Sequence, residues 1–528
     1  MHTDLSPQHV ARSRVRHDAS TGRSIMDQAI SRAADAQRID GNSVRLLRDA
    51  AENYPAWLDA IASAERYVYF EAYIMRDDVS GRRFADALIE KARAGVTVRL
   101  LYDWMGAFAK TPSRFWESLR AAGVEVRCFN PFTLASPLGW VHRDHRKSVV
   151  VDGRIGFITG LCVGDAWVGD PERGLAPWRD TGVEVRGPAV VEIERAFSRV
   201  WAVVGAPIPR EELTARDSIA VAGDTSVRVV ASEPWRARLL RLDELVAGAA
   251  RETLWLADAY YAGMPTHVQA LRAAAKDGVD VRLLVPGGSD IPLLRPLSQA
   301  GYRPLLEAGV RVFEWNGPMM HAKTSVADGR LARVGSSNLN IASWLGNYEL
   351  DAVIEDTAFA ECMVESYLDD LAHATEVVLH RRHRRHRSHD ALPGQSQTHR
   401  MRDRRRGSGS AGRGVAGAIR LGNTVSAAVT DRRVLASADS RAIAVAGAVL
   451  VALAIVAVVW PRVFAIPIAI FSLWFGGAML LQSYRLRAYK ATKSALVPDA
   501  HDEQVAADNP GSASSVEDSA ESSTAVTP

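Results

Sequence analysis

Two histidine–lysine pairs with the same spacing are the residues of this chain best suited to chemistry. In each copy an Asp-Gly pair follows the lysine after four residues. The copies consist of His145, Lys147, Asp152 and Gly153, and of His321, Lys323, Asp328 and Gly329. An imidazole can act as a nucleophile or as an acid, an ammonium can bind phosphate, and a carboxylate can orient a neighbouring group. A double displacement at phosphorus needs two histidines, because one attacks while the other manages the proton of the alcohol.

The spacing within each copy predicts a strand that ends in a hairpin. Residues two apart face the same side of a strand, so His145 and Lys147 project together, and the same holds for His321 and Lys323. Asp-Gly favours a tight turn. Two such hairpins facing each other would form one site with two histidines and two lysines. The lysines would neutralise the phosphoryl oxygens in place of a metal, so we expect neither a metal nor another cofactor.

Both copies lie within a longer internal repeat. Residues 67–73 resemble residues 254–260, and residues 95–101 resemble residues 278–284. Short Val-rich segments alternate with helical ones, so each half is predicted to run strand, helix, strand, helix, strand and then the histidine–lysine motif. This pattern indicates two domains of the α/β class.

Composition limits the number of domains and the class of protein only loosely. The chain has 528 residues, 47% of them hydrophobic, and three widely separated cysteines, Cys128, Cys162 and Cys362. These numbers allow two or three domains and argue against a disulfide framework or a cysteine-based zinc site. The net charge of +3 says little about binding partners, because the charges are unevenly distributed: the Arg/His run at 380–406 and the acidic end of the chain are far apart. We expect the basic run to contact anionic lipid, although a solvated linker or a metal-binding tract would have the same composition.

Two apolar stretches separated by Pro461 and Arg462 follow a Gly/Ser-rich linker. Residues 442–460 and 463–481 each approach the roughly 20 residues that span a bilayer. Basic residues flank the outer ends of this pair, which by the positive-inside rule places both ends in the cytoplasm. The sequence therefore predicts a C-terminal transmembrane helical hairpin, with a buried hairpin of a soluble protein as the alternative.

The motifs together resemble the phospholipase D superfamily, and within it the bacterial cardiolipin synthases. Matching segments around the histidines and downstream of them are residues 143–153, 178–188, 318–324, 335–339 and 347–350. The resemblance implies tandem phospholipase D-like domains, with a mixed sheet flanked by helices, a pseudo-two-fold axis and the active site at the interface. It further implies that Asp180 and Glu349 orient the histidines and that Ser336 and Asn338 bind phosphate or shape the site. In the family the first-half histidine, here His145, is more often the nucleophile and His321 the acid–base, although the sequence alone also allows the reverse. Cys162 departs from the pattern, because family members carry Asn there.

The expected segments follow from these patterns. They are a disordered or helical N-terminal extension (1–40), the first and second phospholipase D-like domains (41–210 and 220–375), a basic His/Arg-rich segment with a linker (380–440), two transmembrane helices (442–482) and an acidic disordered tail (494–528).

The expected function is that of a phosphatidyltransferase at the bacterial inner membrane, with its catalytic part in the cytoplasm. Its substrate would be phosphatidylglycerol, with phosphatidylethanolamine as another possible donor, and the products would be cardiolipin and a free alcohol. A hydrolase of the phospholipase D type would use the same residues with water as the acceptor. A nuclease fits less well because of the membrane hairpin, so no nucleic-acid partner is expected, and a non-catalytic lipid tether would not need both motifs.

Overall fold

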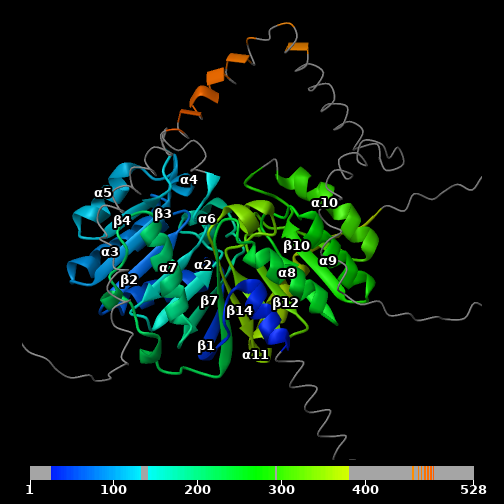
Figure 1. Ribbon diagram of the computed structural model, residues 1–528, viewed down its shortest axis with the longest axis horizontal. Coiled ribbons are helices and arrows are strands. Elements are labelled where there is room, and N and C mark those ends of the chain that lie inside the picture. The colour runs from blue at the N-terminus through cyan, green and yellow to red at the C-terminus, as the bar shows by residue number, and fades with distance from the viewer. Residues whose placement is uncertain are drawn as a thin grey trace, which may run out of the picture. The chain divides into compact units, whose positions relative to one another are not determined.

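Two repeats of the same α/β order make up the folded part of the chain (Figure 1). The computed structural model describes residues 25–132, 141–291 and 294–379, and scattered residues between Ile455 and Leu480. Both repeats belong to one compact unit. The predicted order of strands, helices and motif is thus confirmed.

The first repeat contains seven strands. Its elements are β1 (Ile39–Arg48), α2 (Asp49–Ala62), β2 (Tyr67–Ala72), α3 (Val79–Arg93), β3 (Thr97–Asp103), α4 (Trp104–Ala107), α5 (Ser113–Ala121), β4 (Glu125–Phe129), β5 (Ser148–Val151), β6 (Ile155–Thr159), α6 (Asp165–Val168), the 3₁₀ turn η2 (Pro171–Arg173), β7 (Thr181–Arg186) and α7 (Val190–Val203). Two further 3₁₀ turns, η3 (Arg210–Glu212) and η4 (Arg216–Ser218), lead to the second repeat.

The second repeat follows the same order and adds one strand at its end. Its elements are β8 (Thr225–Ser232), α8 (Arg238–Ala249), β9 (Thr253–Ala257), α9 (Pro265–Lys276), β10 (Asp280–Pro286), α10 (Leu294–Ala308), β11 (Arg311–Trp315), β12 (Thr324–Ala327), β13 (Leu331–Gly335), the π-helical turn η5 (Ala342–Gly346), β14 (Glu349–Glu355), α11 (Thr357–Ala372) and β15 (Ala374–Val377).

The strand order reads the same from either end, apart from β15. The order is β15-β11-β10-β9-β12-β13-β14-β8-β1-β7-β6-β5-β2-β3-β4, and the antiparallel pair of β8 and β1 joins the two repeats at its centre. In the first repeat β2, β3 and β4 pair in parallel, and the first strand of the motif hairpin, β5, pairs antiparallel with β2. In the second repeat β9, β10 and β11 pair in parallel, and β12 pairs antiparallel with β9. This arrangement is the expected mixed sheet with pseudo-two-fold symmetry.

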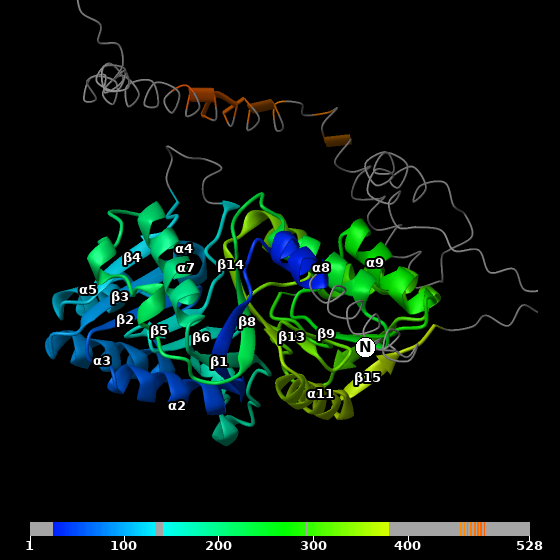
Figure 2. The same ribbon diagram turned by 60° about the horizontal axis from the view of Figure 1, so that its bottom comes forward.

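Three apolar clusters form the core of the unit. One lies between the first-repeat strands and α2, α3 and α5, and another lies between the second-repeat strands and α8, α9 and α10. The third contains α7, α11 and strand residues of both repeats, and β13 packs against β6 and β7 there. Figure 2 shows α2 and α3 on one side of the first-repeat strands and α7 on the other. The central cluster therefore holds the two repeats together.

The N-terminal extension packs on the second repeat through a helix. A helix covers residues 25–34, inside the expected extension, and its Ile30 and Ala34 are buried in the core of the second repeat. The strand β1 then enters the first repeat. The chain before the first repeat thus packs on the second one, which no local pattern in the sequence indicates.

The predicted C-terminal features lie largely outside the described residues. This applies to the basic segment (380–440), the acidic tail (494–528) and most of the predicted transmembrane hairpin (442–482). Among the residues that the structure describes, no helix is both long enough and apolar enough to span a bilayer.

Each motif ends in the tight turn that its Asp-Gly pair predicts. Asp152 and Gly153 have φ angles of 54° and 69°, and the corresponding angles of Asp328 and Gly329 are 50° and 57°. In each turn a backbone N–H closes the loop, from Arg154 to Val151 and from Arg330 to Ala327. Positive φ at both central residues gives the turn a twist that matches the strands, and this explains why the position after Asp is glycine.

Replacing the two turn glycines by alanine tests how tightly each turn is packed. A Cβ at Gly153 would lie 2.4 Å from Thr214 Oγ1 and 3.0 Å from the Tyr67 hydroxyl, whereas at Gly329 it would meet nothing within 4 Å. We expect Gly329→Ala to lose about 1 kcal/mol from its positive φ alone. Gly153→Ala should lose a further ~1–3 kcal/mol through overpacking. Denaturant unfolding of both variants measures the difference, and equal losses would contradict this account.

Candidate active site

The motif histidines and lysines are buried at the start of the two hairpins. His145 and Lys147 immediately precede β5, and His321 and Lys323 immediately precede β12. The exposed fractions of these four residues are 8% and 2%, and 4% and 1%, respectively. Their burial means that any charge they carry is held in surroundings of low polarity, where its interactions are strong.

Each imidazole is held by a carboxylate of the other repeat. His145 Nδ1 donates to Glu349 at the start of β14, with both carboxylate oxygens 3.0 Å away. His321 Nδ1 donates to Asp180 Oδ2, just before β7, at 2.6 Å. Both carboxylates are fully buried. The sequence predicts these two acids as partners but does not show that the pairs cross between the repeats.

Backbone hydrogen bonds reinforce both crossings. The His145 N–H donates to the Tyr348 carbonyl at 2.9 Å, and the His321 N–H donates to the Arg179 carbonyl at 2.7 Å. Tyr348 and Arg179 directly precede Glu349 and Asp180. Each histidine is therefore bound through its backbone to the residue before its carboxylate partner. These symmetric contacts bring the two motifs to one place at the interface between the repeats.

Neither lysine is neutralised by a carboxylate. Lys147 Nζ donates to the His145 carbonyl and Lys323 Nζ to the His321 carbonyl. Within the described part of the chain, no Asp or Glu lies within ion-pair distance of either ammonium. Buried ammonium groups without a counter-ion are costly, and an anionic ligand would remove that cost.

The tautomer of His321 follows from two competing contacts. Its Nδ1 lies 2.6 Å from Asp180 Oδ2 and 2.9 Å from Lys323 Nζ. One nitrogen cannot donate to a carboxylate and accept from an ammonium at the same time, and the shorter, charge-assisted contact favours the proton on Nδ1. The Nε2 atom of each histidine then carries the free lone pair, as an attacking or proton-accepting nitrogen must.

The pKa values show that the four motif side chains act on one another. Burial lowers the pKa of His145, the lysines of both repeats lower it further, and Glu349 opposes them. For His321, burial and Lys323 lower the pKa to about 4, with a further contribution from Lys147 of the first repeat. Burial and Lys147 lower the pKa of Lys323 to about 8. Each lysine therefore influences the histidine of the other repeat as well as its own.

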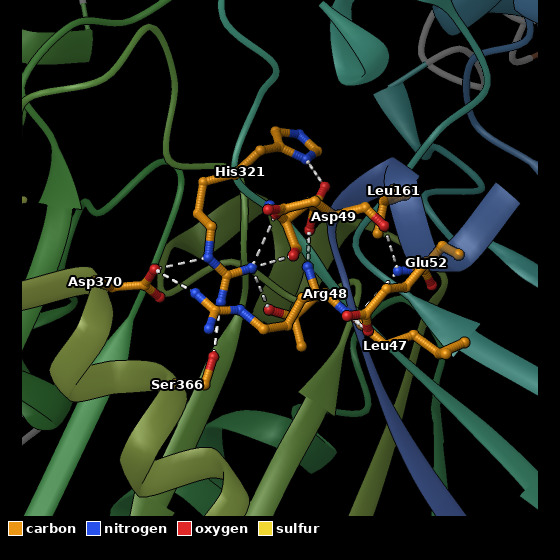
Figure 3. A network of polar contacts seen from close by, with 12 residues as sticks. Leu47, Arg48, Asp49, Glu52, Leu161, His321, Ser366 and Asp370 are labelled. Carbon is orange, nitrogen blue, oxygen red and sulfur yellow. Dashed lines mark hydrogen bonds and ion pairs between the residues drawn. The ribbon is translucent and has the colours of Figure 1, made fainter.

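A buried ionic network fixes the segment that carries Asp180 (Figure 3). The Arg179 guanidinium binds Asp370 Oδ1 at 2.7 Å, Asp49 Oδ1 at 3.1 Å and the Ser366 hydroxyl at 3.0 Å. Asp49 also accepts the Asp180 N–H at 2.8 Å. Because Asp370 and Ser366 lie on α11 of the second repeat, this network clamps the Asp180 backbone between the repeats.

The motif aspartates lie at the opposite end of the hairpins from the histidines. Asp152 accepts the N–H groups of Glu65, Arg66 and Tyr67 at 2.8–2.9 Å, immediately before β2. Asp328 accepts the N–H groups of residues 251–253 in the same way before β9. The structure thus places both carboxylates on strand ends and turns, away from the imidazoles, as the turn preference of the Asp-Gly pairs predicts.

The loops after the hairpins differ between the repeats. Ser336 donates its hydroxyl to Glu349 Oε2 at 2.5 Å, so it supports the carboxylate that holds His145. Asn338 is buried, and its Oδ1 has no partner among the described residues. Cys162 occupies the matching place in the first repeat, where burial raises the pKa of its thiol and Lys147 and Lys323 oppose that rise. The cysteine therefore lies within the electrostatic reach of both lysines.

Aromatic rings that sequence reasoning did not select line the site. Tyr73 packs edge-on to the His145 ring at 4.8 Å, and Tyr260 packs edge-on to the His321 ring at 5.8 Å. Trp167 and Trp178 each lie 5.6 Å from the His321 ring. The repeat alignment held a signal for the tyrosines, because residues 67–73 and 254–260 place them at equivalent positions. Trp178 opens the matching segment 178–188, whereas nothing in the sequence marked Trp167.

Buried acids behind the lysines were also missed. Asp258, equivalent to Glu71 in the repeat, accepts the backbone N–H groups of Leu339 and Tyr260. Burial raises the pKa of Asp258 to about 7, while Lys323 opposes the rise. Burial also raises the pKa of Glu71, which accepts a hydrogen bond from Ser148. In the described part of the chain, no group of three or more His, Cys, Asp or Glu side chains is arranged to hold a metal ion.

Comparison with known proteins gives consistent matches across both repeats. Residues 57–169 and 246–370 match the family described as cardiolipin synthase, PLD-like domain. A cardiolipin synthase of Alkalihalophilus pseudofirmus is 34% identical over 341 residues, which is 64% of this chain and 67% of the relative. Cardiolipin synthase 1 of Bacillus anthracis is 31% identical over 363 residues, which is 67% of this chain and 71% of the relative.

One solved structure is similar to this chain, and the similarity concerns only the fold. The crystal structure of a phosphatidylserine synthase from Haemophilus influenzae superposes with a TM-score of 0.52 at 14% identity, covering 67% of this chain and 92% of that one. The fold, the paired motifs and the relatives agree: the chain belongs to the cardiolipin synthase family of phospholipase D-like enzymes.

Proposed function

We propose that the protein transfers a phosphatidyl group between two molecules of phosphatidylglycerol, which gives cardiolipin and glycerol. The observation that carries this proposal is the pair of buried ammonium groups, with no described carboxylate within ion-pair distance, beside two carboxylate-held imidazoles. Such a site is suited to a monoanionic phosphodiester, whose oxygens the lysines bind while the histidines act on its two ester bonds.

The first half of the reaction forms a covalent intermediate. His145 Nε2 attacks phosphorus, the bond from phosphorus to the glycerol oxygen breaks, and His321 gives its proton to that oxygen. Glu349 stabilises the positive charge that develops on the His145 ring, and Asp180 does the same for His321. In the second half, His321 takes the proton of an acceptor hydroxyl, whose oxygen attacks phosphorus and releases His145.

The pKa values suit these roles once the substrate is present. A lowered pKa keeps His145 neutral and able to attack at neutral pH. The pKa of His321, about 4 in the free protein, is held down by burial and by the nearby lysines. A bound phosphodiester neutralises those lysines and raises the pKa of His321, so the imidazole can gain and lose a proton during turnover.

The lipid substrate implies a place at the membrane. We propose that the apolar segments at 442–482 anchor the enzyme in the bacterial inner membrane and that the basic run at 380–406 binds anionic lipid on its cytoplasmic side. The name of the relatives and the lipid nature of cardiolipin support this location.

Product analysis tests the transfer reaction directly. Purified full-length protein in mixed micelles with phosphatidylglycerol should form cardiolipin and glycerol in equal amounts without added metal. Thin-layer chromatography and mass spectrometry measure both products. If phosphatidic acid were the only lipid product, water would be the acceptor, and the enzyme would be a hydrolase of the phospholipase D type.

Substituting the histidines tests their separate roles. His145→Ala should abolish turnover because no covalent intermediate can form, and His321→Ala should lower it by about 10²–10⁴ because the leaving alcohol is no longer protonated. His142→Gln is the matched control. This half-buried histidine lies three residues before His145, and its Nδ1 contacts the Gly346 carbonyl, so the variant enzyme should keep its activity. Substantial turnover by His145→Ala would sink the two-histidine mechanism.

A pair of aspartate substitutions separates orientation from folding. Asp180→Asn should lower kcat by about 10²–10⁴ with little change in melting temperature, because the amide cannot stabilise a charged His321. Asp152→Ala should lose about 3 kcal/mol of stability, because the N–H groups of residues 65–67 lose their acceptor, while the folded enzyme keeps its kcat within a few-fold. Activity per folded molecule, with melting curves, measures both, and the reverse pattern would refute the assignment.

A further inference from the structure

A cavity next to the active site is lined by an arginine whose side chain forms no hydrogen bond or ion pair with the residues that the structure describes. The cavity has a volume of about 520 Å³, and its lining includes Arg76, Asp165, Arg173, Leu175, Trp178 and Pro318. This volume lies within the range of small-molecule sites in proteins. Trp178 links the cavity to the active site, because its ring lies 5.6 Å from the His321 ring.

Arg76 is the distinctive residue of this cavity. Its backbone N–H donates to the Val163 carbonyl, and its side chain extends over Gly164, next to the Cys162 loop. The Arg76 Nε atom is buried and has no hydrogen-bond partner among the described residues, and none of the ion pairs found there includes its guanidinium. A buried N–H without an acceptor is costly, so this side chain is prepared for an anion.

The acidic residues of the cavity are already engaged. Asp165 accepts the backbone N–H groups of Val79 and Ser80. Asp170 accepts the backbone N–H of Arg173 and lies 4.0 Å from the Arg173 guanidinium. The Arg173 side chain is 76% exposed. The charge of Arg76 helps to lower the pKa of Asp165, but no hydrogen bond or ion pair joins the two side chains. The N–H groups of Arg76 therefore remain available to an anion in this cavity.

The second repeat has no equivalent of this cation. Continuing the alignment of residues 67–73 with residues 254–260 places Gly263 opposite Arg76. A cationic cavity therefore adjoins His321 without a counterpart of the same chemistry in the other repeat. This difference suits a reaction in which both alcohols, the one leaving and the one entering, are handled by His321.

We propose that this cavity binds the headgroup of the acceptor lipid, with Arg76 on its phosphodiester and Trp178 guiding its terminal hydroxyl to His321. This inference rests on the proposed transfer reaction. A single glycerol unit separates the hydroxyl from the phosphodiester in phosphatidylglycerol, so a hydroxyl at His321 brings that anion into the neighbouring cavity. His321 takes the hydroxyl proton, the oxygen bonds to phosphorus, and the electron pair of the phosphorus–nitrogen bond returns to His145.

A chromogenic donor separates the two halves of the reaction. Phosphatidyl-p-nitrophenol releases nitrophenolate when His145 attacks, before any acceptor is needed, and phosphatidylglycerol is then varied as the acceptor. Arg76→Gln should raise the acceptor concentration at half-maximal cardiolipin formation about tenfold, the loss expected for one charge-assisted hydrogen bond. The nitrophenolate burst should stay within twofold. Arg76→Lys should recover part of the loss. Arg114→Gln is the control, because this exposed arginine lies outside the cavity, and it should change the acceptor constant less than threefold.

The possible outcomes distinguish this site from the reaction itself. If the wild-type enzyme releases nitrophenolate but forms only phosphatidic acid, the transfer proposal fails, and the acceptor site fails with it. Suppose that the wild-type enzyme forms cardiolipin. If Arg76→Gln then leaves the acceptor constant unchanged, or lowers the nitrophenolate burst as much as it lowers cardiolipin formation, only the acceptor site is refuted. Soluble glycerophosphoglycerol should compete with the lipid acceptor in an Arg76-dependent way. Equal competition by inorganic phosphate would mean a general phosphate site and would overturn the lipid assignment.

Discussion

The exchange of carboxylates between the repeats is the interaction on which the rest of this structure depends. Glu349 of the second repeat holds His145 of the first, and Asp180 of the first holds His321 of the second. All four side chains are buried, so separating the repeats would leave each acid without its imidazole. Breaking a buried charged pair costs several kcal/mol. The central apolar cluster and the Arg179 network, which ties Asp180 to α11, maintain this docking. Assembly of the repeats and assembly of the site are therefore one event.

This exchange also leaves the lysines available. Because the two carboxylates are committed to the imidazoles, Lys147 and Lys323 have only backbone carbonyls as hydrogen-bond acceptors near their ammonium groups. Their positive charge lowers the pKa of both histidines in the free protein. A phosphodiester would neutralise the lysines and restore the basicity of the imidazoles, so substrate binding and proton transfer are coupled by charge.

The two repeats differ in several residues around the site, where their roles in the reaction would differ. The first repeat has Cys162, within the electrostatic reach of both lysines, at the position of Asn338 in the second repeat. Arg76 aligns with Gly263 in the same way. Trp167 and Trp178 pack on His321, whereas Tyr73 is the ring nearest His145. A symmetric scaffold thus carries an asymmetric site. That asymmetry fits one histidine that stays bound to phosphorus between the half-reactions and another that handles the exchanging alcohols.

The sequence by itself determined the repeat, the order of its elements, the Asp-Gly turns and the identity of the paired histidines and lysines. These features follow from local rules: alternation along strands, turn preference and the chemistry of side chains. It also marked Asp180 and Glu349, but not which histidine each one holds. Only the tertiary structure decided that the pairs cross, that Asp152 and Asp328 bind strand ends, that the helix at 25–34 packs on the second repeat, and that Arg76 and Trp178 share a cavity. Each of these depends on contacts between segments more than 70 residues apart, and such contacts are set by how whole sheets pack rather than by any local pattern.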